Sequence, residues 1–211
     1  MGPGPGRVSV RIERVGMRKV LLLYRRMIPS IRLCGHCQLE ALAAEGKIEY
    51  RAVQGMRLKP SDLLCDVYCG AGTITLTMAR HCREAIGIEI VPAAVENAKQ
   101  NALRNGVGNA SFKAGRAEEL LPRMVADGLR PDVIVVDPPR KGLDPAVIRA
   151  MAEAAPDRLV YVSCNPATLA RDAGLLKAEG YLVRKVQPVD MFCWTSGVET
   201  VCLFTKAQDD N

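Results

Sequence analysis

Four side chains that could bind a ligand or attack one each stand at the end of a short apolar run. They are Asp66, Glu89, Asp137 and Cys164, which close the runs Leu63-Leu-Cys-Asp, Ala85-Ile-Gly-Ile-Glu, Val133-Ile-Val-Val-Asp and Leu159-Val-Tyr-Val-Ser-Cys. A carboxylate accepts hydrogen bonds from sugar hydroxyls, and a thiolate can add to an electron-poor carbon. If the runs are strands of one parallel sheet, their ends meet at one edge, where such sheets bind ligands.

Helical patterns between the runs support this arrangement. Residues 92–105 place Val95, Ala98 and Ala102 on one stripe, and Gly106 follows as a stop signal. Two further helices are predicted, one opening at Pro145 and one over 166–178, and late strands are predicted over 181–185 and 200–204. Apolar strands that alternate with helices predict an α/β fold, with a Rossmann-like, mostly parallel seven-stranded sheet and helices on both faces.

The segment Gly70-Ala-Gly72 follows the first run and opens a helix, as in turns whose backbone approaches a ligand. A lone Gly-x-Gly also occurs in dinucleotide-binding enzymes, but their third glycine is absent here and Thr73-Ile-Thr75 follows. Asp66 precedes the turn, and Glu89 at the next strand end could accept both hydroxyls of an adenosine ribose. These features favour an S-adenosylmethionine site over a dinucleotide site or a purely structural turn.

Three other segments could contribute to this site. In Asp137-Pro-Pro-Arg140, the consecutive prolines stiffen the backbone and could hold a carboxylate or carbonyl oxygen over the pocket. Many methyltransferases acting on base nitrogens have a similar motif, but with an aromatic residue where this chain has Arg140. Cys164 precedes a helix and could act as a thiolate, whereas the tetrapeptide around it, taken alone, favours a buried thiol. The segment Gly115-Arg-Ala-Glu118 fits equally well beside an adenine or as an exposed helix cap.

Together these motifs resemble those of the RNA uracil-5-methyltransferases, which act on tRNA or ribosomal RNA. The matching segments, in family order over roughly residues 50–205, are Asp66-Val-Tyr-Cys-Gly-Ala-Gly-Thr73, Ile86-Gly-Ile-Glu89, Asp137-Pro-Pro-Arg-Lys-Gly142, Ser163-Cys-Asn-Pro-Ala-Thr-Leu-Ala-Arg-Asp172 and Val198-Glu-Thr200. The run Ser-Cys-Asn-Pro-Ala-Thr is highly specific. The resemblance implies a class I S-adenosylmethionine-dependent methyltransferase with an RNA substrate.

The resemblance also implies a role for individual residues. Cys164 matches the family's nucleophile, which adds to carbon 6 of uracil, and Glu199 matches the base that removes the proton from carbon 5. Without the resemblance, Glu199 would be interpreted as an exposed glutamate at the start of a strand. The predicted cofactor-binding residues are Tyr68, Thr73, Glu89 and Asp137, with Gly70 and Gly72 forming the turn beside them.

The first part of the chain has a different character from the rest. Residues 1–60 carry 12 Lys and Arg against 4 Asp and Glu, so this segment could meet RNA phosphates or be a solvated basic arm. We interpret 1–46 as the remnant of an RNA-binding and iron–sulfur region, and 47–211 as the methyltransferase domain. Cys34 and Cys37 resemble two iron–sulfur ligands, but Ile28 replaces a third and such clusters need four, so we predict no cluster and no metal site.

Other features limit the class of protein. No apolar run approaches about 20 residues, which predicts no membrane span. The N-terminus lacks the apolar core of a signal peptide, so we expect a cytoplasmic protein whose eight cysteines are thiols. No obligate protein partner is evident.

Departures from the family pattern leave two alternatives open. The central domain and an upstream Phe-x-Gln segment are missing, and Cys193 and Gly197 replace a proline and a histidine. The chain is therefore interpreted as a shortened member, and one alternative is a weakly active or non-catalytic remnant that binds cofactor or RNA. The other alternative is a base-nitrogen methyltransferase, against which Arg140 and Cys164 argue.

Overall fold

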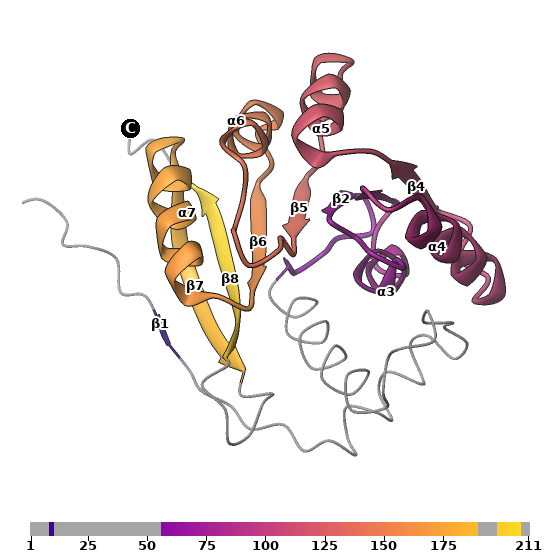
Figure 1. Cartoon of the computed structure of the whole chain (residues 1–211), viewed down its shortest axis with the longest axis horizontal. Coiled ribbons are helices and arrows are strands. Elements are labelled where there is room, and N and C mark those ends of the chain that lie inside the picture. The colour runs from indigo at the N-terminus through magenta and orange to yellow at the C-terminus, as the bar shows by residue number, and fades with distance from the viewer. Residues whose placement is uncertain (1–8, 11–55, 190–197, 208–211) are drawn as a thin grey trace, which may run out of the picture.

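The computed structural model describes residues 9–10, 56–189 and 198–207, which form one sheet with helices packed on it (Figure 1). The strands are β1 (Ser9–Val10), β2 (Leu63–Val67), β3 (Glu84–Glu89), β4 (Ala110–Ala114), β5 (Val133–Val136), β6 (Arg158–Ser163), β7 (Tyr181–Val189) and β8 (Glu199–Lys206). The helices are α3 (Thr73–Ala79), α4 (Pro92–Arg104), α5 (Ala117–Ala126), α6 (Pro145–Ala154) and α7 (Pro166–Ala178).

The strands lie in the order β1-β7-β8-β6-β5-β2-β3-β4. Only β8 runs against its neighbours β6 and β7, and every other pair is parallel. The seven-stranded, mostly parallel sheet predicted from the sequence is confirmed in β2–β8, and the two-residue β1 adds an eighth strand beside β7. The chain order reverses between β2 and β5, which is where open α/β sheets bind ligands.

Helices cover both faces of the sheet, and this explains why the central strands are continuously apolar. In β5, Ile134 and Val136 belong to the core cluster under α5, α6 and α7. The alternate residues Val133 and Val135 belong to a second cluster with α3. Helix α4 packs on this second side through a smaller cluster around Phe112. The predicted three-layer arrangement is therefore confirmed.

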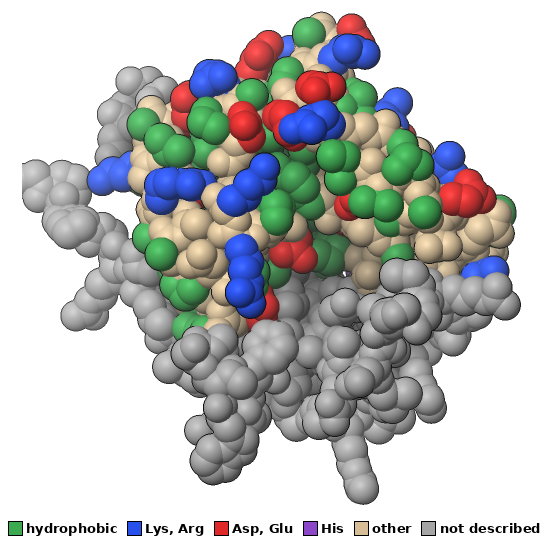
Figure 2. All heavy atoms as spheres, in the orientation of Figure 1, with side chains coloured by type: hydrophobic (Ala, Val, Ile, Leu, Met, Phe, Trp, Pro, Cys, Tyr) green, Lys and Arg blue, Asp and Glu red, His purple; other side chains and the backbone are tan. Residues whose placement is uncertain are grey.

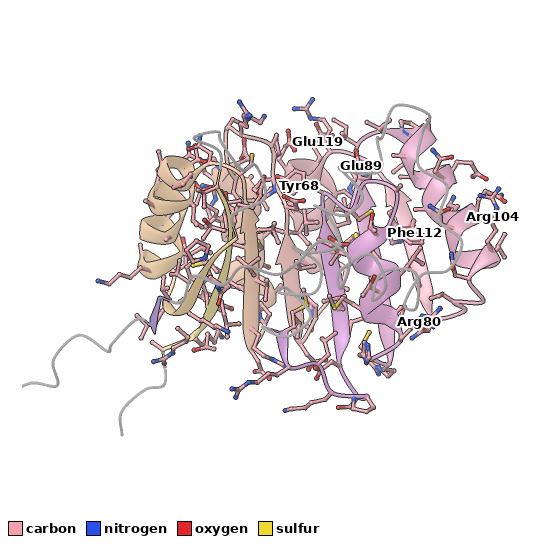
Figure 3. The ribbon with its side chains drawn as sticks, turned by 90° about the horizontal axis from the view of Figure 1, so that it is seen from below. Tyr68, Arg80, Glu89, Arg104, Phe112 and Glu119 are labelled. Atoms are coloured by element: carbon pink, nitrogen blue, oxygen red, sulfur yellow. The ribbon has the colours of Figure 1, made fainter. Side chains whose placement is uncertain are left out.

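The register of the central strands brings the predicted site residues to one edge of the sheet. Val67, the last residue of β2, is paired with Ile88 on β3 and with Val136 on β5. Tyr68, Glu89 and Asp137 each come one residue after these paired positions, so all three reach the same edge. Figure 3 shows Tyr68 and Glu89 there, with Arg80 toward the opposite edge.

Candidate active site

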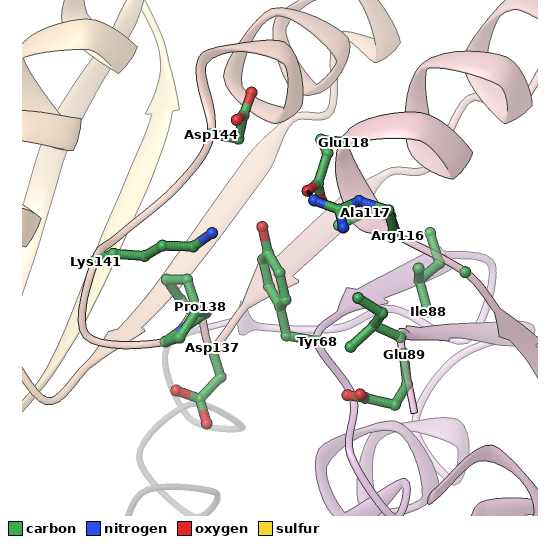
Figure 4. Close-up of a pocket in the computed structure, with 13 residues that line it drawn as sticks. Tyr68, Ile88, Glu89, Arg116, Ala117, Glu118, Asp137, Pro138, Lys141 and Asp144 are labelled. Carbon is green, nitrogen blue, oxygen red and sulfur yellow. Dashed lines mark hydrogen bonds and ion pairs between the residues drawn. The ribbon is translucent and has the colours of Figure 1, made fainter. Parts of the chain in front are cut away.

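A cavity of about 500 Å³ opens at this edge, a size that suits a small organic ligand (Figure 4). It is lined by Tyr68, Ile88, Glu89, Ile90, Gly115, Arg116, Ala117, Glu118, Asp137, Pro138, Pro139, Lys141 and Asp144. Apolar walls thus alternate with a few acidic and basic side chains. Of the predicted cofactor-binding residues, Tyr68, Glu89 and Asp137 line the cavity together.

The Glu89 side chain, at the end of β3, accepts hydrogen bonds both from the glycine turn and from the backbone just after its own strand. Its Oε2 accepts a hydrogen bond from the Gly70 amide at 3.1 Å, and its Oε1 accepts one from the Val91 amide at 2.9 Å. A carboxylate has about four lone-pair sites, so both oxygens keep capacity to accept hydrogen bonds from a ligand. The backbone therefore fixes this side chain in the orientation in which a ligand would meet it.

Tyr68 leads the chain from β2 into the glycine turn and supplies an aromatic wall of the cavity. Its φ of 74° lies in the left-handed region, which costs a non-glycine residue about 1 kcal/mol or more. The amides of Tyr68 and Cys69 both donate to the Ile88 carbonyl oxygen at 2.9 Å and hold this conformation. Burial, with the charge of Glu118, raises the pKa of Tyr68 to about 12, so its hydroxyl stays protonated. Figure 4 shows the ring between Pro138 and Lys141 on one side and Glu118 on the other.

The glycine turn is anchored from two sides by buried polar groups. Asp66 is fully buried, and its Oδ2 accepts a hydrogen bond from the Thr75 hydroxyl in the first turn of α3 at 2.6 Å. Burial raises the pKa of Asp66 to about 7. From α4, the Asn101 side-chain amide donates to the Ala71 carbonyl oxygen at 3.2 Å. These contacts set the position of the turn relative to β2 and both helices.

Gly70 and Gly72 adopt the conformation that the predicted turn requires. Their φ angles are 54° and 85°, in the region that favours glycine. Neither glycine, nor Thr73 at the start of α3, is among the residues that line the cavity. Their predicted contact with the cofactor stays a prediction, and in the structure they shape the turn beside the cavity.

We expect Gly72→Ala to lower the free energy of unfolding by about 2–4 kcal/mol, because two penalties act together. The φ is unfavourable for alanine, and the added Cβ would lie 2.9 Å from Phe112 Cε1 and 3.0 Å from Ala98 Cβ. Gly106→Ala is the matched control, since Gly106 also has a positive φ but meets nothing within 4 Å. Urea unfolding of both variants measures the difference, and equal losses would contradict a steric role for Gly72.

The predicted nucleophile and the predicted base adjoin the last paired residues of β6 and β8. Ser163 on β6 is paired with Thr200 on the antiparallel β8. If this register is continued by one residue past the end of β6, Cys164 falls opposite Glu199. Cys164 is half-buried and directly precedes the first turn of α7, whose Asn165 accepts a hydrogen bond from the Ala167 amide and caps the helix. The positive end of a helix dipole favours negative charge at such a position.

Glu199 is at the start of a strand but is not exposed. Only 8% of its surface is accessible, so the interpretation of Glu199 as an exposed glutamate is wrong. Burial raises the pKa of Glu199, and the charge of Arg140 opposes this shift. A carboxylate with a raised pKa is suited to accepting a proton from carbon.

Residues 115–118 lie both at the start of a helix and at the wall of the cavity. Arg116 occupies the position before α5 without capping it through its side chain, and residues 115–118 all line the cavity. The Arg116 guanidinium pairs with Glu118 at 2.6 Å. Ile90 and Asp144 also line the cavity, and neither was predicted as a site residue. Lys141 lines the cavity as well; it belongs to the matching segment Asp137-Pro-Pro-Arg-Lys-Gly142, although no role was predicted for it.

Several predictions concern residues outside the described part of the chain. Cys34, Cys37, Cys193 and Gly197 lie there, as does the proposed boundary at residue 46. Within the described ranges, the five cysteines are free thiols, and no cluster of His, Cys, Asp or Glu has a metal-binding arrangement. No helix in those same ranges is long and apolar enough to cross a membrane.

Comparison with known proteins places these motifs in a family. Residues 37–207 match the profile of the tRNA (uracil-5-)-methyltransferases. An uncharacterized RNA methyltransferase of Enterococcus faecalis is 52% identical over 161 residues, which are 76% of this chain and 34% of the relative. One of Clostridium acetobutylicum is 46% identical over 160 residues, covering 76% of this chain and 35% of the relative. The chain thus spans about a third of the length of the curated relatives it matches.

Solved structures agree with the profile. The tRNA (uracil-54, C5)-methyltransferase of Pyrococcus abyssi, in complex with S-adenosyl-L-homocysteine, aligns with a TM-score of 0.66 and 29% identity over 78% of this chain and 38% of its own. A precorrin-6y C5,15-methyltransferase of Geobacter metallireducens has a TM-score of 0.69 at 14% identity over 86% of this chain and 96% of its own, a likeness of fold alone. The fold is therefore that of the class I S-adenosylmethionine-dependent methyltransferases, and the chain belongs to the tRNA (uracil-5-)-methyltransferase family of RNA methyltransferases.

Proposed function

We propose that this chain is the catalytic domain of an S-adenosylmethionine-dependent enzyme that methylates carbon 5 of a uridine in tRNA or ribosomal RNA. The observation that supports the proposal is the register of β6 and β8, which, continued by one residue past Ser163 and Thr200, would set Cys164 opposite the buried Glu199. A nucleophilic thiol and a carboxylate base are the two groups that this reaction needs from the protein. Family membership and the Pyrococcus relative support the same reaction.

The residues around the cavity fit S-adenosylmethionine. Glu89 can accept hydrogen bonds from both ribose hydroxyls, as acidic residues at this position of such sheets do. Tyr68 offers an aromatic face and a protonated hydroxyl, and Asp137 offers a carboxylate at the opposite wall. Residues 115–118 complete the wall near Glu89 and would lie beside the adenine. When bound, the cofactor supplies an electrophilic methyl group.

In the proposed reaction, the Cys164 thiolate adds to carbon 6 of uracil and forms a carbon–sulfur bond. The electron pair of the ring double bond moves to carbon 5 as an enolate, which makes this otherwise poor nucleophile reactive. Carbon 5 takes the methyl group as its bond to the sulfonium sulfur breaks, which leaves the thioether S-adenosylhomocysteine, and Glu199 then accepts the proton from carbon 5. The returning electron pair reforms the double bond and expels the thiolate, leaving 5-methyluridine and protonated Glu199.

Basic side chains near the site fit an RNA substrate. Arg140 and Lys141 are exposed in the segment after β5, and Arg171 on α7 keeps 51% of its side chain exposed. Figure 2 shows Lys and Arg side chains gathered on the α7 side of this face. Lys and Arg contacts with phosphates give a large, sequence-independent part of RNA affinity.

We expect Glu89→Gln to raise the dissociation constant for S-adenosylmethionine about 10- to 100-fold. The substitution replaces one accepting oxygen by a donor that faces either the Gly70 or the Val91 amide, and removes the charge that favours the ribose hydroxyls. Isothermal titration calorimetry measures the change. Glu84→Gln, at the other end of β3, should bind as the wild type does, and an unchanged constant for Glu89→Gln would contradict the assignment.

The proposed function is tested by identifying the methylated nucleoside. Unmodified RNA is incubated with the chain and isotopically labelled S-adenosylmethionine, digested to nucleosides and analysed by mass spectrometry. We expect the label in 5-methyluridine. Label at a base nitrogen would support the base-nitrogen alternative, and cofactor binding without any labelled nucleoside would support the non-catalytic alternative.

A further inference from the structure

The segment 137–144, which connects β5 to α6 and lines the cavity, is fastened to α7 by a carboxylate that the mechanism above does not use. Asp172 on α7 is fully buried. Its Oδ2 accepts hydrogen bonds from the Leu143 amide at 2.8 Å and from the Tyr161 hydroxyl at 2.7 Å. One side chain thus joins the segment 137–144, strand β6 and helix α7.

Arg171 completes the attachment from the solvent side. Its Nε and Nη2 donate to Asp172 Oδ1 at 2.8 and 2.6 Å, and its Nη2 also donates to the Lys141 carbonyl oxygen at 3.0 Å. Both carboxylate oxygens are therefore satisfied, which a buried charge requires to be stable. The guanidinium bridges the carboxylate and the backbone of the segment, so the two residues act as one unit.

The backbone of the segment fits tightly against this pair. Residues 139–142 form a turn in which the Gly142 amide donates to the Pro139 carbonyl oxygen at 2.8 Å. Gly142 has a φ of 80°, and a Cβ on it would lie 2.5 Å from both Arg171 Nη2 and Asp172 Oδ2. The absence of a side chain at Gly142 is what lets the turn approach the pair so closely.

A second attachment lies directly beside the predicted nucleophile. Asn165, the residue after Cys164, donates from its Nδ2 to the Arg140 carbonyl oxygen at 3.2 Å. Asn165 caps the N-terminus of α7 and Asp172 lies in the middle of this helix, so they hold the segment at two points along its length. One side of the segment therefore lines the cavity through Asp137 and Lys141, and its backbone is tied to the helix that follows Cys164.

We propose that Asp172, together with Arg171, is a positioning residue of this active site. It holds the cavity-lining segment 137–144 in a fixed place relative to α7, and so holds the methyl donor in register with the sulfur of Cys164. This inference rests on the proposed function, since it assigns Cys164 as the attacking group. Misplacement of reacting groups by about 1 Å can cost about 100-fold in rate.

The test compares Arg171→Lys and Asp172→Asn with two matched controls. Arg171→Lys keeps the charge, loses the paired Nε and Nη2 hydrogen bonds to Asp172 Oδ1 and leaves the buried core intact, so it remains informative if Asp172→Asn fails to fold. Arg149→Lys on α6 and Asp127→Asn after α5 change exposed residues of the same types. The single-turnover rate of methyl transfer is measured at saturating RNA and cofactor. Dividing it by the number of cofactor-binding sites found by calorimetry gives the rate per site. A purely structural role would lower the number of sites and leave the rate per site unchanged.

We expect the rate per site to fall about 10-fold or more in both variants, with a smaller change in cofactor affinity and none in the controls. Alkylation of Cys164 by iodoacetamide, followed in peptide mass spectra, gives a second readout that needs no methyl transfer, and its rate should change several-fold in the same two variants. Wild-type rates in both assays would overturn the role of Asp172. A wild-type chain that binds cofactor but transfers no methyl group would refute the proposed function, and the alkylation comparison would still decide whether Asp172 positions Cys164.

Discussion

Replacing Cys164 with alanine is expected to reduce methyl transfer to RNA by on the order of 10⁴-fold or more, while cofactor binding stays unchanged. Without the sulfur, no nucleophile adds to carbon 6, and carbon 5 of uracil keeps its low nucleophilicity. Cys164 is not among the residues that line the cavity, so the affinity for S-adenosylmethionine should not change. Transfer of labelled methyl groups and calorimetry on the same preparation measure the two effects.

Cys82→Ser is a suitable control for this substitution. Cys82 is a free, buried cysteine whose sulfur contacts the Glu84 carbonyl oxygen at 3.4 Å, and a serine hydroxyl could donate there as well. The Cys82→Ser chain should transfer methyl groups at the wild-type rate. A Cys164→Ala chain whose rate stays within about tenfold of the wild type would contradict the covalent mechanism.

Replacing Glu199 with glutamine should stop turnover at a later step than the loss of Cys164. The amide cannot accept the proton from carbon 5, so the methylated uracil stays bound to Cys164. Denaturing gel electrophoresis should then reveal a covalent protein–RNA complex that forms with ordinary RNA and requires S-adenosylmethionine. Glu153→Gln, at an exposed position of α6, should turn over normally and leave no such complex. Absence of the complex in Glu199→Gln, or undiminished turnover, would contradict the assignment of the base.

The protonation of Glu199 also predicts how the wild-type rate depends on pH. Burial raises the pKa of Glu199, and Arg140 partly opposes the shift. Because the base acts only when it is ionised, breakdown of the adduct should slow as the pH falls through a value above the ordinary glutamate pKa. Removing the charge in Arg140→Gln should raise that pKa further and move this acidic limb to higher pH.

Much of the fold could be predicted because local patterns and tertiary structure agree. The stripe of Val95, Ala98 and Ala102 with a proline before it and Gly106 behind it predicted α4 almost to the residue. Strand β7 extends further than the predicted 181–185, through Val189. Its sequence contains Gln187 and a proline, and its pairing with β8 shifts register between Val183 and Lys185, so it lacks regular alternation.

The site was predictable where it depends on strand ends and less so where it depends on distant contacts. Tyr68, Glu89 and Asp137 each lie at the carboxyl edge of a strand, which any parallel sheet would bring together. The burial of Glu199 depends on what packs around β8 and has no local signature. The attachment of Asp172 to the segment 137–144 joins residues 29 positions apart, and neither spacing nor periodicity marks such a pair.

The most direct test of the proposed chemistry uses RNA that contains 5-fluorouridine. Fluorine at carbon 5 cannot be removed by Glu199 as a proton would be, so the adduct formed after methyl transfer persists. With S-adenosylmethionine present, we expect a protein–RNA complex that survives denaturation, and digestion should map a methylated fluorouracil to the peptide containing Cys164. A complex attached to another residue, or no complex from a chain that binds both cofactor and RNA, would contradict the proposed mechanism.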